Sequence, residues 1–198
     1  MSTITVKELA APTGYDLKIA AGETLDLKSQ GTVTMPTGSV LQVKQATFFD
    51  TMSSTSNGTF VNITDLTVTI TPQSTSSKFL LTTSINFTAA ENAAPSFRFS
   101  GGNSTSYVGN ARSNRRRVGF GGGDDFFNGA SSAASNGGFS ASMNYLDSPS
   151  TASSITYTVQ CMSDANGAIY INRPIGDPDS SGEGYTSASS LIVMEVEG

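Results

Sequence analysis

The strongest constraint on the fold is an alternation of apolar and polar residues between positions 60 and 87. Residues 66–70 (LTVTI) have the period of two that a β-strand with one buried face requires. Pro72 ends this strand because proline lacks the N–H that strand pairing uses, and the alternation restarts at residue 79. We therefore predict a β-hairpin, with two strands on either side of a turn rich in Pro, Ser and Thr.

The same pattern recurs along the chain and predicts an all-β protein. Further short runs are separated by Gly, Pro, Ser and Asn, at a number and spacing typical of a β-sandwich, most simply a jelly roll. The last run, residues 190–196, is densely apolar and predicts a central, buried strand. The strands are expected at residues 40–49, 60–70, 79–89, 96–99, 117–120, 138–147, 155–161, 167–172 and 189–195.

The composition indicates a folded chain with one main domain. Its 198 residues are enough to bury a core, and 11 Phe and 6 Tyr supply the material for one. Only 14% of the residues are charged, which is low for a disordered chain. The single cysteine, Cys161, lies in an expected strand and is predicted to be a core residue.

Residues 1–38 differ from the rest of the chain. They contain three very short apolar segments separated by glycines, and a segment of this size is not stable as an isolated sheet. Two interpretations are open: edge strands of the main domain, or a β-rich docking arm or short stalk, which we favour. The chain then divides into an arm (1–38) and a sandwich head (39–198). The expected docking residues are Leu17, Ile19, Leu25, Leu27 and Val33.

Several functional classes fit this chain poorly. It has no histidine, so a Ser–His or Cys–His nucleophile pair and a histidine-bound metal are excluded, and we expect neither an enzyme nor a cofactor. A net charge of −5 disfavours nucleic-acid binding. No apolar run approaches the roughly 20 residues of a membrane helix, so no membrane insertion is expected. The polar N-terminal residues predict no secretory signal.

Segments of the expected head resemble a known family. They are residues 39–43 (SVLQV), 60–87, 145–151 (YLDSPST), 157–160 (YTVQ), 169–173 (IYINR) and 190–195 (SLIVME). In this order and spacing, they resemble the β-sandwich heads of tailed-bacteriophage fibre and virion proteins. The resemblance covers residues 39–198. It implies a non-enzymatic, homotrimeric component of the virion, assembled in the host cytoplasm and bound to other virion proteins.

Three functions follow as expectations. The favoured one is a fibre-like or spike-like appendage that attaches through its arm and uses its head for adhesion to the host surface. Only about forty residues precede the head, whereas a typical fibre has a long shaft, so decoration of the capsid shell stays open. A free carbohydrate-binding module is the third possibility, although the chain has no Trp for stacking on sugars.

One basic cluster is the candidate contact surface, formed by Arg112, Arg115, Arg116 and Arg117. Arginine suits contacts with carboxylates, so the cluster would bind an anionic host glycan or form an ionic seam with a neighbouring copy. A solvated loop that discourages aggregation is the simpler interpretation. The nearby Asp124 and Asp125 would face the cluster. The adjacent Phe126 and Phe127 are predicted to bury at least one ring against another copy.

The segment 177–182 partly matches a calcium-binding loop. Oxygen-bearing side chains stand at Asp177, Asp179 and Ser181, and a glycine follows at Gly182. Ala188 occupies the twelfth position, where such a loop needs a glutamate. We expect a polar surface turn here.

Overall fold

The computed structural model describes residues 13, 21–22, 35–104, 107–123, 138–163, 167–182 and 184–198. Its contacts divide the chain into two compact units, Met1–Met35 and Pro36–Gly198. The expected docking residues of the arm lie outside the described residues, so their role stays a prediction: Leu17, Ile19, Leu25, Leu27 and Val33.

The second unit is built from β-strands, and no helix occurs in the ranges given above. The predicted all-β class is confirmed. The strands are β1 (Val40–Phe48), β2 (Met52–Ser54), β3 (Val61–Ile70), β4 (Lys78–Ala89), β5 (Pro95–Ser100), β6 (Phe120–Gly121), β7 (Phe139–Asp147), β8 (Ile155–Ser163), β9 (Ile169–Ile171) and β10 (Ser189–Val196).

Among the residues that the structure describes, the first sheet, sheet A, has six strands. β10 lies between β1 and β4. β7 pairs with β4 over much of the same stretch as β10 does, and therefore occupies the opposite edge of β4. β9 pairs with the end of β4 beyond β10, and β2 pairs with β9. The last strand of the chain is thus central in its sheet, as its apolar sequence predicts.

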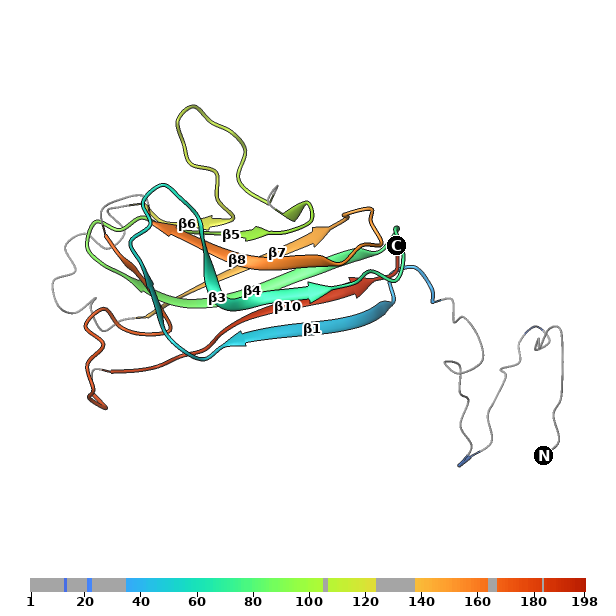
Figure 1. Ribbon diagram of the computed structural model, residues 1–198, viewed down its shortest axis with the longest axis horizontal. Helices are drawn as coiled ribbons and strands as arrows, with labels where there is room; N and C mark the ends of the chain where they lie inside the picture. The colour runs from blue at the N-terminus through green and yellow to red at the C-terminus, as the bar shows by residue number, and fades with distance from the viewer. Residues whose placement is uncertain are drawn as a thin grey trace. The chain divides into compact units, whose positions relative to one another are not determined.

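The second sheet, sheet B, has four strands in the described part of the chain, in the order β3-β8-β5-β6. Every pairing between strands in the two sheets is antiparallel. Figure 1 shows the strands of both sheets running along the same direction of this unit. This is the aligned packing of a β-sandwich.

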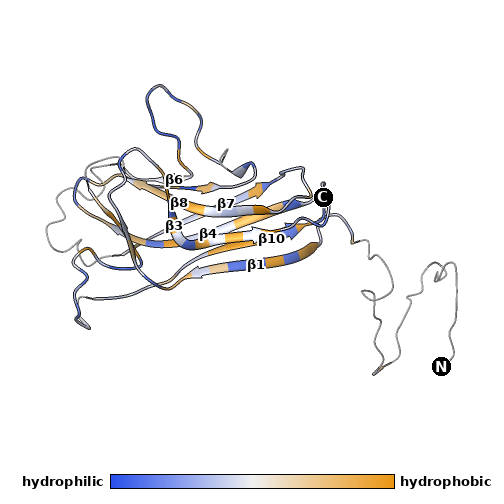
Figure 2. Ribbon diagram, in the orientation of Figure 1, coloured by the Kyte–Doolittle hydropathy of each residue, from blue (hydrophilic) through white to orange (hydrophobic). Residues whose placement is uncertain are grey.

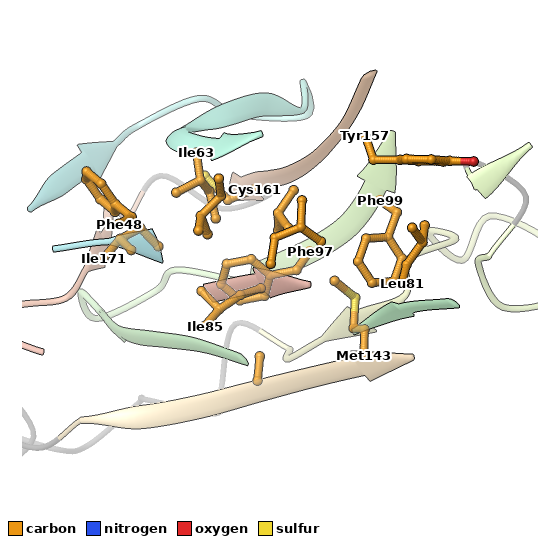
Figure 3. Packing of buried hydrophobic residues seen from close by; sticks show 14 of the residues in the cluster. Phe48, Ile63, Leu81, Ile85, Phe97, Phe99, Met143, Tyr157, Cys161 and Ile171 are labelled. Carbon is orange, nitrogen blue, oxygen red and sulfur yellow. The ribbon is translucent and has the colours of Figure 1, made fainter. Parts of the chain in front are cut away.

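The core lies between the two sheets. β4 and β10 alternate buried and half-buried residues, so each presents one face to the core. The ring of Phe79 in sheet A is 5.8 Å from that of Tyr157 in sheet B, and Phe87 is 5.0 Å from Phe97. Figure 3 shows side chains from both sheets filling the space between them. Burial of each such ring stabilises the fold by roughly 1.5–3 kcal/mol.

Cys161 is a core residue, as predicted. It lies on β8 and is fully buried. Burial raises the pKa of its thiol to about 12, because the charged thiolate is poorly solvated among apolar side chains. The thiol is therefore neutral and inert at physiological pH.

The predicted β-hairpin is wrong. The two strands form where the alternation places them, but β3 pairs with β8 in sheet B and β4 pairs with β10 and β7 in sheet A. Residues 71–77 therefore cross from one layer to the other. A tight hairpin uses two to five loop residues, whereas a segment of this length spans the roughly 10 Å between packed sheets. The buried carboxylate of Glu195 accepts a hydrogen bond from the Gln73 N–H at 2.6 Å and holds the crossing segment against β10.

The structure also differs from the sequence-based prediction at two short strands. The strand expected at residues 117–120 is reduced to β6, because only Phe120 and Gly121 pair with β5. The short strand β2 was not predicted, since its sequence, Met52-Ser53-Ser54, has too few residues to show a period.

Of the adjacent aromatic pair at the end of β1, Phe48 is in the core and Phe49 is 76% exposed.

Candidate functional site

A long connection between β5 and β6 carries the predicted basic cluster. Its outer part, residues 107–119, is called the arginine loop here. Figure 1 shows this segment, in yellow-green, standing out from the two layers. Its base is fixed by backbone hydrogen bonds from the Ser104 N–H to the Gly101 carbonyl at 3.0 Å and from the Tyr107 N–H to the Ser104 carbonyl at 2.9 Å.

The two sides of the arginine loop are joined by hydrogen bonds. The Gly109 N–H donates to the Val118 carbonyl at 3.1 Å, and Arg117 Nε donates to the Gly109 carbonyl at 2.8 Å. The outer end turns where the Arg115 N–H donates to the Arg112 carbonyl at 3.0 Å. The arginines therefore sit at and beside the tip of a hairpin-like projection.

The four arginines of the cluster differ in their exposure to solvent. Arg112, Arg115 and Arg117 are exposed, whereas Arg116 is half-buried and its Nη1 lies 3.5 Å from Ser96 Oγ on β5. Burial lowers the pKa of the Arg116 guanidinium. Three guanidinium groups are thus presented to solvent, and the fourth holds the loop against sheet B.

The other predicted contact residues lie outside the described residues. The ionic seam between the arginines and the two aspartates, and the burial of a phenylalanine against another copy, therefore stay predictions. The residues concerned are Asp124, Asp125, Phe126 and Phe127.

A hollow of about 340 Å³ lies at the base of the arginine loop, and is called the tyrosine hollow here. Two half-buried tyrosines, Tyr107 of the loop and Tyr145 of β7, meet in it with ring centroids 5.2 Å apart. The Tyr107 ring also contacts Phe99 of the core, at 5.9 Å. The lining residues are Tyr107, Val108, Gly109, Val118, Gly119 and Tyr145.

Glycine at position 119 allows this part of the loop to approach the sandwich. A Cβ there would stand 2.7 Å from Met143 Sδ, on the strand that carries Tyr145. The Gly119 N–H donates to the Phe97 carbonyl of β5 at 2.9 Å. The floor of the tyrosine hollow is therefore fixed to both sheets.

A buried carboxylate ties the base of the connection to β7. Asp147, the last residue of β7, accepts hydrogen bonds from Tyr157 Oη at 2.8 Å and from the Asn103 N–H at 3.1 Å. Its other oxygen, Oδ1, has no hydrogen-bond partner. Burial and this carboxylate raise the pKa of Tyr157, so the phenol stays a donor. The contact fixes residues 101–104 relative to the strand that carries Tyr145.

Sequence reasoning found the arginines but missed the tyrosine hollow. Tyr107 and Tyr145 are far apart in the chain and have no shared motif. They meet only because β7 lies at the edge of sheet A beside the β5–β6 connection. No local signal in the sequence identifies such a pair.

A second hollow, of about 530 Å³, lies at the segment considered for calcium. The Asp177 carboxylate is 3.7 Å from Arg173 Nη1, so it faces a cation of the protein itself. Within the described ranges, no group of three or more His, Cys, Asp or Glu residues is placed to hold a metal ion. The hollow is lined by Asp177, Pro178, Asp179, Ser180, Ser181, Gly184, Tyr185 and Thr186.

Comparison of the chain with protein-family models and with curated proteins finds no match. Among the described residues, no helix is long and apolar enough to cross a membrane.

Proposed function

We propose that this chain is a non-enzymatic component of a tailed-phage particle: a homotrimeric appendage that attaches through its N-terminal arm and binds the host surface with its head. The observation that carries the proposal is the projecting arginine loop with the tyrosine hollow at its base. A rigid two-layer scaffold that holds a cationic loop above an aromatic hollow is suited to adhesion.

The strand order supports the viral interpretation of the fold. If β1, β3, β4, β5, β6, β7, β8 and β10 are lettered B to I along the chain, sheet A contains B-I-D-G and sheet B is C-H-E-F. The first and last strands are thus neighbours, and both sheets receive strands from both halves of the chain. This order supports a jelly roll, the eight-stranded double sheet of many viral capsid and lectin domains.

The ligand class that best fits the site is an acidic glycan. The faces of Tyr107 and Tyr145 offer apolar contact to sugar rings, while their hydroxyl ends remain polar. Arg117 lies on the rim, because its Nε is hydrogen-bonded to the carbonyl of Gly109, which lines the hollow. A guanidinium there would bind a sugar carboxylate through two hydrogen bonds. Three weak sites on one trimer would add through avidity.

Binding of the full-length protein to an array of acidic and neutral oligosaccharides tests this site. The change of Tyr107 to Ala, and the joint change of Arg115, Arg116 and Arg117 to Ala, are each expected to weaken binding to acidic glycans by about 10-fold or more. Tyr170→Ala and Arg173→Ala are matched controls, because this stacked pair lies outside the site. Retention of full affinity by both site variants, or equal binding of neutral and acidic glycans, would contradict the assignment.

Removal of residues 1–35 tests the docking arm. The second compact unit begins at Pro36, and the Gly38 N–H donates to the Glu197 carbonyl at 2.8 Å, so the truncation spares the pairing that closes this unit. We expect the truncated protein to keep a β-sheet circular-dichroism spectrum and a cooperative thermal transition, but to lose co-sedimentation with particles. If it still occupies particles as fully as the intact chain, the arm is not the docking element.

The tyrosine hollow also favours a second candidate, a carbohydrate-binding module that acts alone. The two candidates differ in what accompanies binding. A module would bind its glycan as a single 20.5 kDa chain and would be absent from particles. The proposed appendage would bind as an oligomer and would purify with them.

A further inference from the structure

The outer face of sheet A carries a row of apolar side chains. Cross-strand pairing places Val43 of β1 opposite Met194 of β10, Met194 opposite Leu80 of β4, and Leu80 opposite Leu146 of β7. One apolar residue from each of the four strands thus lies in a single line across the sheet.

These side chains point away from the core. Leu81 and Val193, next to Leu80 and Met194 in sequence, are fully buried, and successive residues of a strand face opposite sides. At the two edges of the sheet, Val43 is 55% and Leu146 is 50% exposed. Val40, paired with Val196 next to this row, is 53% exposed. Met194 and Leu80, between the two edges, are half-buried, so apolar side chains reach the surface on all four strands.

The same face is almost free of charge. Its remaining outward positions on the four strands are Ser, Thr, Asn, Gln, Ile and Val, and Lys78 at the end of β4 is the one charged residue among them. Figure 2 shows orange, apolar segments on the neighbouring strands β1, β4 and β10, and this colouring includes the core-facing residues of these strands. An exposed apolar patch rimmed by polar residues is typical of a surface that a partner covers.

The size of the face suits a protein interface. Four strands spaced by about 4.8 Å, with roughly nine residues each, give a flat area of about 600 Å². Side chains make the accessible area larger, so it approaches the roughly 800 Å² that each partner contributes to a stable interface.

We propose that the outer face of sheet A packs against a second copy of this chain. Each copy has a net charge of −5, so two copies repel one another least where they meet through a face without carboxylates. The inference rests on the proposed oligomeric appendage and names the surface that holds its heads together.

Sedimentation equilibrium of the full-length chain tests the proposal with Val43→Glu and Leu146→Glu. Both positions are on edge strands and half-exposed, so a glutamate is tolerated in the single chain but leaves a buried, unpaired charge in the interface. We expect the wild type to sediment as an oligomer, and each variant to dissociate about 100-fold more readily. Phe49→Glu is the control, because Phe49 is more exposed but lies beyond β1.

A second measurement distinguishes loss of the interface from misfolding of the glutamate variants. In Val43→Cys, the new thiol is the accessible one, because Cys161 is fully buried. Its reaction with a thiol reagent is expected to be slow at concentrations at which the chain is oligomeric and fast after dilution. An oligomer unaffected by both glutamates, with a thiol that reacts equally fast at both concentrations, would overturn this interface alone. A wild type that stays a single chain at all concentrations would overturn the proposed oligomeric function as well.

Discussion

Replacement of Phe97 by Ala is expected to lower the free energy of unfolding by about 4 kcal/mol. Phe97 lies on β5 of sheet B and is fully buried. Its ring is 5.0 Å from that of Phe87 in sheet A, in an edge-to-face arrangement, and 6.1 Å from that of Phe120. The substitution removes an aromatic ring from between the layers and leaves a cavity. Urea unfolding at one fixed protein concentration measures the loss.

Phe49→Ala is the matched control for this prediction. Phe49 is 76% exposed, so its truncation is expected to change stability by less than about 0.5 kcal/mol. If Phe97→Ala does not fold, Phe97→Leu is expected to remain folded and to cost about 1 kcal/mol. A loss below about 1 kcal/mol in Phe97→Ala would contradict the packing of the two sheets through this ring.

Alkaline pH is expected to destabilise the fold through Cys161. Its pKa rises from an ordinary value of 9.0 to about 12 in the folded chain. Below pH 9 the thiol is protonated in both states and has no effect. Above pH 9 the unfolded chain releases this proton and the folded chain does not, so stability falls by about 1.4 kcal/mol per pH unit. The total loss by pH 12 is about 4 kcal/mol. The raised pKa of Tyr157 acts in the same direction at higher pH.

Cys161→Ala isolates this effect from other groups that titrate in alkali. The variant loses a little packing at every pH, but its free energy of unfolding should fall less steeply than that of the wild type. Between pH 8 and pH 10.5 the difference between the two proteins is expected to change by about 2 kcal/mol. Parallel curves for the two proteins over this range would show that the thiol is not buried as described.

The sequence predicts the strands far better than their partners. In β3 and β10, apolar residues alternate with polar or less buried ones, and the structure buries one face of each. The alternation of apolar and polar residues indicates which face of a strand is buried. It does not indicate which other strand pairs with that strand. This is why β3 and β4 were both located from the sequence and yet wrongly joined as a hairpin. Their partners, β8 and β10, are distant in the chain.

In the candidate site, too, features formed by residues that are neighbours in sequence could be predicted, and features formed by strand pairing could not. Arg112, Arg115, Arg116 and Arg117 are neighbours in sequence, so a composition-based search finds them. Tyr107 meets Tyr145 only through the order of strands in sheet A, and the apolar row from Val43 to Leu146 exists only through the register of four strands. Features made by long-range pairing become visible only once the topology is known.

Electron microscopy of particles from a culture that makes this chain, labelled with an antibody against the head, tests the central claim most directly. We predict label at fixed positions on purified particles. Label at the tail would indicate a fibre-like appendage, and label over the shell would indicate capsid decoration. Particles without label, with all of the chain left in the particle-free fraction, would contradict the assignment to the virion.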